Sequence, residues 1–134
     1  MTDSELIKRA EIARANAYAP YSKFSVGSAL LAKSGKVYIG CNIENSAFTP
    51  TVCAERVAFF KALSEGEREF FSIAIVGGKA GEPSTFCPPC GVCRQVMAEF
   101  CDADFRILLG TTENYRLYLL RDILPLAFSL DNPT

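Results

Sequence analysis

The hydrophobic positions of this chain alternate between the two periods that distinguish helices from strands. Apolar side chains recur at helical spacing in three segments, which are expected to form helices: residues 4–18, 54–63 and 91–100. Short apolar runs, continuous or alternating, predict five strands: residues 26–33, 36–43, 72–78, 105–110 and 115–120. The tail offers at most a short helix, which Pro125 would break.

Local signals mark the ends of these segments. Asp3 or Ser4 is expected to cap the first helix, and Pro20 ends its pattern. Ser34 and Gly35 form a two-residue link that is typical of a tight hairpin. Strands on either side of the second and third helices can pair in parallel only through a crossover. We therefore expect an α/β fold, a layered domain with a mixed five-stranded sheet flanked by helices.

Length, composition and charge narrow the class of protein. Residues 1–134 are most simply one domain, long enough to bury a single core. The net charge of -1 leaves no basic face for a polyanion, so a small ligand is favoured over nucleic acid. The charged first residues contain no secretory apolar run, and no segment approaches the roughly 20 apolar residues that span a bilayer. We expect a cytoplasmic protein that has no membrane partner.

Cysteine is the residue type that carries candidate chemistry. Cys90 and Cys93, three apart at the start of a predicted helix, project from one face, and Cys53 lies at the start of another. Three thiolates leave a tetrahedral zinc ion with one open position, as in catalytic zinc sites. Cys87 adds an overlapping C-x-x-C, but the two prolines before Cys90 disfavour convergence, so we expect a packed thiol. Three disulfides are the weaker reading of the six cysteines, because we expect a reducing compartment.

The stretch TVCAER places an acidic residue, Glu55, and a positively charged residue, Arg56, close to Cys53. Because the chain has no histidine, a proton shuttle next to a zinc-bound water is expected to be a carboxylate, and Glu55 is the nearest acid in sequence. Three thiolates make the site negative, and Arg56 is placed to donate to their sulfurs beside the two helix N-termini. The alternatives are a glutamate that only suits the helix dipole and a solvated surface arginine.

Five motifs resemble the zinc-dependent cytidine deaminases in their short, three-cysteine form. They are P-Y-S-K-F-S-V-G-S-A-L (20–30), G-C-N-I-E-N-S-A (40–47), C-A-E-R (53–56), P-C-G-V-C-R-Q-V (89–96) and L-P-x-x-F (124–128). The resemblance implies the cytidine deaminase fold over the whole chain. It also implies one Zn²⁺ per chain on Cys53, Cys90 and Cys93, with Glu55 transferring protons.

The same resemblance implies how a nucleoside substrate binds. The expected contacts are the Phe24 ring and the Ala54 backbone at the base, Asn42 and Glu44 at the ribose, and Phe128 from a neighbouring subunit. The last contact implies a homotetramer. Phe48 departs from the pattern, because many relatives have tyrosine there, so a hydroxyl near the subunit boundary is missing.

The implied activity is that of a hydrolase of pyrimidine salvage. It would convert cytidine and 2'-deoxycytidine to uridine and 2'-deoxyuridine with release of ammonia. One alternative is deamination of a cytosine-nucleoside antibiotic such as blasticidin S, and another is a non-catalytic zinc module with four cysteine ligands. A nucleic-acid deaminase is disfavoured because no excess of Lys or Arg accompanies the site.

Overall fold

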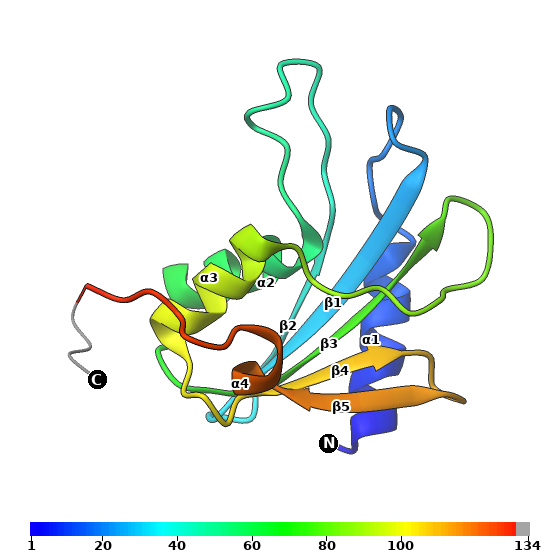
Figure 1. Ribbon diagram of the computed structural model, residues 1–134. Coiled ribbons are helices and arrows are strands. Elements are labelled where there is room, and N and C mark those ends of the chain that lie inside the picture. Colours follow the sequence, from blue (N-terminus) through cyan, green and yellow to red (C-terminus); the bar gives the residue numbers. More distant parts are fainter. Residues whose placement is uncertain (131–134) are drawn as a thin grey trace.

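The fold is a mixed sheet with helices on both faces, and the computed structural model describes residues 1–130 (Figure 1). In chain order the elements are α1 (Asp3–Arg14), β1 (Phe24–Ala32), β2 (Val37–Cys41), α2 (Ala54–Ser64), β3 (Phe70–Lys79), α3 (Gly91–Phe100), β4 (Arg106–Gly110), β5 (Tyr115–Leu119) and α4 (Leu120–Ile123). The three predicted helices and five predicted strands are all present, and the strand ends lie within two residues of their predicted positions.

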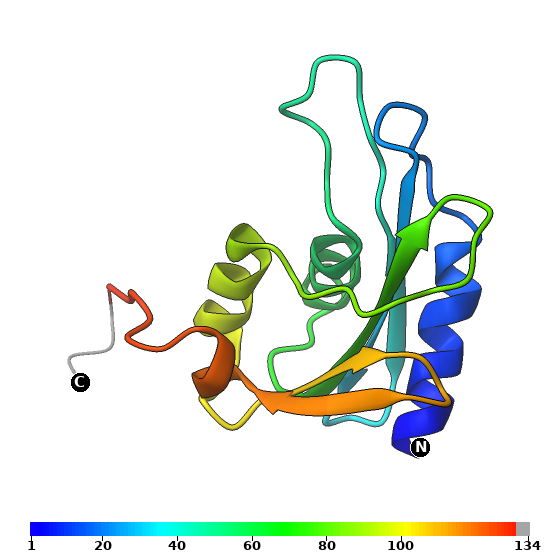
Figure 2. The ribbon, with the colours of Figure 1, turned by 45° about the vertical axis from the view of Figure 1, so that its right-hand side comes forward.

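The strand order is β2-β1-β3-β4-β5. β3 and β4 are parallel and are joined through α3, whereas the other neighbouring pairs are antiparallel. The predicted mixed five-stranded sheet is therefore confirmed. A crossover between parallel strands normally places its helix against the sheet, and α3 lies on the same face as α2 (Figure 2).

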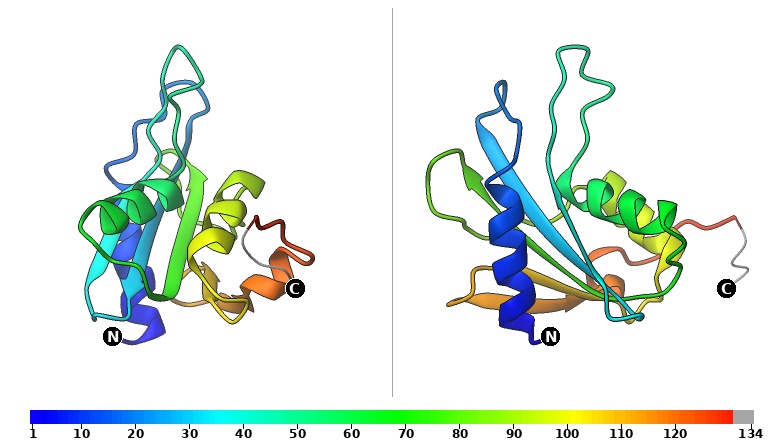
Figure 3. Two further views of the ribbon diagram at one scale, coloured as in Figure 1. Left: turned by 90° about the vertical axis from the view of Figure 1, so that its left-hand side faces the viewer. Right: turned by 180° about the vertical axis from the view of Figure 1, so that it is seen from behind.

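Both faces of the sheet are covered, which explains the continuous apolar run in β3. Ile73 and Ile75 pack in the cluster that contains α2 and α3, while Ala74 and Val76 pack in the cluster beneath α1. Among the helices of residues 1–130, only α1 lies on this face of the sheet (Figure 3). A strand that is buried on both sides loses the alternation of apolar and polar residues.

The first helix differs from its prediction at both ends. Thr2, rather than Asp3 or Ser4, is the cap, because its Oγ1 accepts from the Glu5 N–H at 3.1 Å while the Glu5 carboxylate accepts from the Thr2 N–H at 2.9 Å. The helix ends at Arg14 rather than at residue 18. Beyond it the Tyr18 N–H donates to the Asn42 carbonyl at 3.0 Å, so the chain pairs with the segment after β2 instead of continuing the helix.

The hairpin between β1 and β2 is one residue longer than predicted. Residues 33–35 separate Ala32 from Lys36, and the Ala32 N–H donates to the Lys36 carbonyl at 2.9 Å. Gly35 has a φ of +95°, the left-handed conformation that closes three-residue hairpin loops. The tail forms one helical turn, α4, which ends before Pro125 as predicted.

The sheet places two loops at one edge. β2 and β3 are both antiparallel to β1, so they run in the same direction and end at the same edge. From that edge residues 42–53 lead to α2 and residues 80–90 lead to α3 (Figure 1). Both helices thus begin after loops from a common edge. Within residues 1–130, no helix combines the length and apolar character that crossing a membrane requires.

Candidate metal centre and active site

Three sulfur atoms converge where α2 and α3 begin. The Sγ atoms of Cys53, Cys90 and Cys93 lie within 4.8 Å of one another. The Cys53 and Cys90 sulfurs are 3.6 Å apart, and those of Cys90 and Cys93 are 3.4 Å apart. Tetrahedral zinc with Zn–S bonds of about 2.3 Å holds its sulfurs about 3.8 Å apart. The donor type and spacing therefore fit a zinc ion.

The local fold explains this convergence. Cys53 is the N-cap of α2 and Cys90 is the N-cap of α3. The Cys90 sulfur accepts from the Cys93 N–H at 3.4 Å, which folds the first turn of α3 back over the thiol. Each helix directs the positive end of its dipole at the sulfurs. Cys90 is exposed, so the cluster opens to the surface.

Electrostatics within the cluster favour a bound cation. The neighbouring Cys93 thiol and the Arg56 guanidinium lower the pKa of Cys53 to about 5, although burial opposes them. The same contact with Cys53 raises the pKa of Cys93. One thiolate is thus stabilised, and its charge opposes formation of a second. A divalent metal ion would remove this opposition, because thiols that coordinate metals deprotonate.

Arg56 and Glu55 follow Cys53 on the first turn of α2. Arg56 Nη2 donates to the Cys53 sulfur at 3.4 Å, as the sequence predicts. Glu55 is only 4% exposed, and burial raises the pKa of its carboxyl group to about 7. Within residues 1–130, Glu55 Oε1 is buried without a hydrogen-bond partner. Because such an atom is costly to leave unpaired, it indicates a polar ligand or water at this position.

Cys87 does not join the cluster of three sulfurs. Its sulfur lies over Gly77, where an added Cβ atom would be only 2.8 Å away. Burial, followed by the charges of Glu55 and Cys53, raises the pKa of Cys87 to about 11. This placement agrees with the predicted packed thiol and gives no fourth ligand.

Asn42 lies directly after β2 and binds the start of β1. Its Oδ1 accepts from the Val26 N–H at 2.8 Å, and its Nδ2 donates to the Phe24 carbonyl at 2.8 Å. Phe24 is 37% exposed at the first position of β1. The side chain predicted to contact ribose therefore also fixes the backbone of the residue predicted to contact the base.

Glu44 binds the loop before β1. Its Oε1 accepts from the N–H groups of Tyr21 and Ser22 at 3.0 and 3.1 Å, and its Oε2 accepts from the Ser22 hydroxyl. These contacts lower the pKa of Glu44, with the Ser22 hydroxyl as the largest cause. No local sequence pattern predicts this role of Glu44. Tyr21 and Ser22 lie in one polar motif and Glu44 in the next, but they are 22 or 23 residues apart. No local sequence signal therefore indicates that they pair.

Ala54 and Phe128 have contrasting environments. Ala54 is fully buried, and its carbonyl accepts from the Ser28 hydroxyl at 2.8 Å. Ser28 was missed because it lies in an apolar strand pattern. Phe128 is 67% exposed on the tail, where its carbonyl accepts from Gln95 Nε2 at 3.0 Å.

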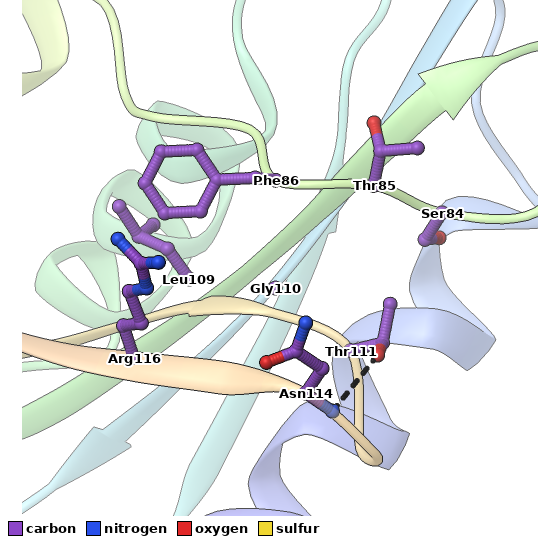
Figure 4. Close-up of a pocket in the computed structure, with 8 residues that line it drawn as sticks. All are labelled: Ser84, Thr85, Phe86, Leu109, Gly110, Thr111, Asn114 and Arg116. Atoms are coloured by element: carbon purple, nitrogen blue, oxygen red, sulfur yellow. Dashed lines mark hydrogen bonds between the residues drawn. The ribbon is translucent and has the colours of Figure 1, made fainter.

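A separate cavity of about 530 Å³ lies beside the β4–β5 hairpin. Phe86, Leu109 and Arg116 contribute to its lining, and the Asn114 N–H donates to the Thr111 hydroxyl at its far end (Figure 4). None of the predicted site residues lines this cavity. The cysteine cluster is therefore a distinct feature.

Comparison with known proteins places this geometry in a family. The family model described as the cytidine and deoxycytidylate deaminase zinc-binding region matches residues 1–109, which include all three clustered cysteines. The chain belongs to this deaminase family.

Relatives within the cytidine deaminase family match nearly the whole chain. A cytidine deaminase of Sporosarcina psychrophila is 47% identical over 133 residues, covering 98% of this chain and 95% of that protein. A cytidine deaminase of Halalkalibacterium halodurans is 48% identical over 128 residues, covering 95% of this chain and 94% of that protein. The crystal structure of cytidine deaminase from Burkholderia pseudomallei has a TM-score of 0.86 and 45% identity, covering 96% of this chain and all of that one. The predicted family and fold are confirmed.

Proposed function

We propose that this protein is a zinc-dependent hydrolase that deaminates cytidine and 2'-deoxycytidine to uridine and 2'-deoxyuridine, releasing ammonia. The observation that carries the proposal is the unpaired, buried Oε1 of Glu55 at the start of the helix capped by Cys53. Similar proteins that are named cytidine deaminases support the choice of substrate.

The chain's own residues supply the proton transfers. Cys53, Cys90 and Cys93 would hold the zinc ion, and bound zinc lowers the pKa of water toward neutrality. Glu55, with a pKa of about 7, can both accept and release a proton near neutral pH. In our proposal its Oε1 takes one proton from the water that attacks C4 and passes it to ring N3. It then takes the remaining proton of that oxygen and gives it to the amine as the C4–N bond breaks, which leaves a C4 carbonyl and ammonia.

The remaining site residues bind and orient the nucleoside in this proposal. The exposed Phe24 ring lies against the base, and the Ala54 backbone contacts the pyrimidine. Asn42 and Glu44 hold the ribose. Both side chains can form further hydrogen bonds with a substrate, because an amide has two N–H donors and a carboxylate has about four acceptor positions. Their contacts with the start of β1 and the preceding loop would pre-organise the pocket.

We also propose a homotetramer in which Phe128 completes a neighbouring site. Large apolar side chains are exposed on the loop before α2 and on the tail, with Phe48 74% and Phe128 67% accessible. A neighbouring subunit that covered these side chains would remove their apolar surface from water. Light scattering is expected to give four times the chain mass of 14.6 kDa. Phe128→Ala should raise KM for cytidine more than it lowers kcat.

The proposed substrate is a free nucleoside in the cytoplasm, with neither nucleic acid nor membrane as a partner. All six cysteines are free thiols, the state that a reducing compartment maintains. The near-neutral net charge gives no electrostatic attraction to a polyanion.

The deciding experiment measures ammonia release from cytidine by the purified protein. Activity should disappear when zinc is removed and return when zinc is restored. Blasticidin S, assayed in parallel, should be a much poorer substrate. Cobalt substitution should show three sulfur ligands, whereas four would favour a non-catalytic zinc module. A zinc-loaded protein that releases no ammonia from cytidine would refute the proposed function.

A further inference from the structure

Two consecutive side chains of α3 reach the C-terminal segment. Arg94 Nε donates to the Pro89 carbonyl at 2.8 Å, and Arg94 Nη1 donates to the Ile123 carbonyl at 2.7 Å. Gln95 Nε2 donates to the Phe128 carbonyl at 3.0 Å. Arg94 thus joins the residue before Cys90 to the last residue of α4, and Gln95 holds the tail five residues further on.

The Arg94 guanidinium binds backbone carbonyls and forms no ion pair within residues 1–130. Within residues 1–130 the ion pairs are Asp3 with Arg106 and Asp104 with Arg121, so Arg94 faces no carboxylate. Its guanidinium is instead shared between two backbone carbonyls that belong to separate segments. A planar guanidinium can donate in two fixed directions at once, whereas a lysine ammonium at the end of a flexible stem cannot reproduce that fork.

The position of α3 makes these ties important for the metal centre. Cys93 and Met97 are the fully buried residues of α3, and Val96, Ala98 and Phe100 pack against the core while partly exposed, so ties to other segments add to the hold on this helix. Pro89 is fully buried, and Arg94 fixes its carbonyl immediately before the Cys90 ligand. Arg94 is therefore a direct physical link between the end of α4 and the segment that presents Cys90.

We propose that Arg94 is a positioning residue that couples the zinc centre to the C-terminal segment, and that Gln95 is a positioning residue for the tail. Arg94 acts on both, because it binds the approach to Cys90 and the end of α4. Gln95 acts on the tail alone, through the Phe128 backbone. The inference rests on the proposed function for the role of Phe128 in a neighbouring pocket, but the coupling itself concerns metal retention and tail order.

Single substitutions separate these two roles. Arg94→Lys keeps the charge and should release zinc to a chromogenic chelator about tenfold faster than the parent, as is typical when support around a ligand is lost. Gln95→Ala should release zinc at the parent rate, yet both variants should increase protease cleavage of the tail and raise KM for cytidine. Arg9→Lys, at an exposed position of α1, is the matched control and should change none of these quantities.

A second measurement uses the native holoprotein, so it does not depend on a variant that folds. Energetic coupling is reciprocal, so removing zinc should speed amide hydrogen exchange in residues 124–129 more than in the loop at 80–84. Unchanged exchange in 124–129, or parent-like zinc release by Arg94→Lys, would overturn the coupling. Faster zinc release by Gln95→Ala equal to that of Arg94→Lys would overturn the division of roles. Zinc release, cleavage of the tail and hydrogen exchange do not depend on whether cytidine is the substrate.

Discussion

Helix α2 brings one sulfur to the cluster and helix α3 brings two, but the two helices are embedded differently. α2 buries five residues: Ala54, Glu55, Ala58, Phe59 and Ala62. α3 buries two, Cys93 and Met97. The half of the site that contains Glu55 therefore belongs to the core, whereas the half that supplies most of the sulfur lies at the periphery.

The contacts beneath α2 show how close this packing is. At Gly40 of β2 an added Cβ would lie 2.4 Å from the Ala54 carbonyl oxygen and 2.7 Å from the Ala58 nitrogen. The Ser28 hydroxyl binds the same Ala54 carbonyl from β1. At Gly91, the first residue of α3, an added Cβ would meet nothing within 4 Å. Glu55 is thus held by close packing, while Cys90 and Cys93 depend on local ties.

The largest expected effect tests the chemistry of the buried half. Glu55→Gln removes the proton carrier but keeps its shape, so kcat for cytidine should fall by about 10²- to 10⁴-fold. Zinc content and the thermal midpoint should stay close to those of the parent. Glu113→Gln, at an exposed position of the β4–β5 loop, is the control and should retain full turnover. Parent-like turnover in the Glu55 variant would show that another group moves the protons.

Glycine substitutions compare the packing of the two helices directly. Gly40→Ala should lower the free energy of unfolding by about 1–3 kcal/mol, because backbone atoms of α2 occupy the space of the new methyl group. Gly91→Ala should change it by less than about 0.5 kcal/mol, because the methyl group enters open space. Urea denaturation of both zinc-loaded variants measures the difference. Equal losses would mean that α2 is no more closely packed than α3.

A smaller effect is expected when the hydrogen bond beneath α2 is removed. Ser28→Ala deletes a fully buried hydroxyl that donates to Ala54, and should cost about 0.5–1.5 kcal/mol of unfolding free energy. Ser64→Ala, which removes an exposed hydroxyl at the other end of α2, should cost less than about 0.5 kcal/mol. If the two costs are the same in urea denaturation, the Ser28 contact does not anchor the helix.

The contrast between these regions also explains what could be predicted from sequence. The helices, the strands and the pairing of Cys90 with Cys93 follow from short-range signals, namely periodicity and C-x-x-C spacing. Cys53 lies 37 residues from Cys90, and its place in the cluster was predicted from its position at the start of another helix and from the family resemblance. The first helix is shorter than predicted. The chain beyond it is held by a hydrogen bond from the Tyr18 N–H to the Asn42 carbonyl, and this contact spans many more residues than the helical repeat does. The cap of this helix, Thr2, lies one or two residues before the predicted Asp3 or Ser4, because all three are good capping residues.

The unpredicted features of the site are all long-range contacts. Asn42 reaches Val26 across 16 residues, Glu44 reaches Tyr21 across 23, and Ser28 reaches Ala54 across 26. No local pattern reports which polar side chain meets which backbone group once the sheet forms. The same limit applies to Arg94 and Gln95, whose partners in the tail lie 29 and 33 residues away.

The smallest expected effect concerns the pH dependence of the two sides of the site. On the side of β1 and β2, hydrogen bonds led by the Ser22 hydroxyl hold the pKa of Glu44 below its ordinary value of 4.5. A carboxyl group whose pKa is depressed by folding stabilises the native state fully above its unfolded pKa. That contribution is lost as the pH falls through the folded pKa.

The measurement is the difference in unfolding free energy between the parent and Glu44→Gln, taken from pH 7 down to pH 3. The difference should be constant from pH 7 to about 5.5 and should shrink below pH 4.5, because protonated Glu44 no longer accepts as an anion from the 21–22 loop. On the α3 side the corresponding difference for Arg94→Lys should not change over this range, because both cations stay charged. If the free-energy difference between the parent and Glu44→Gln stays unchanged down to pH 3, the 21–22 loop is held without the charge of the carboxylate. The Glu44 side of the site would then be no more sensitive to pH than the Arg94 side.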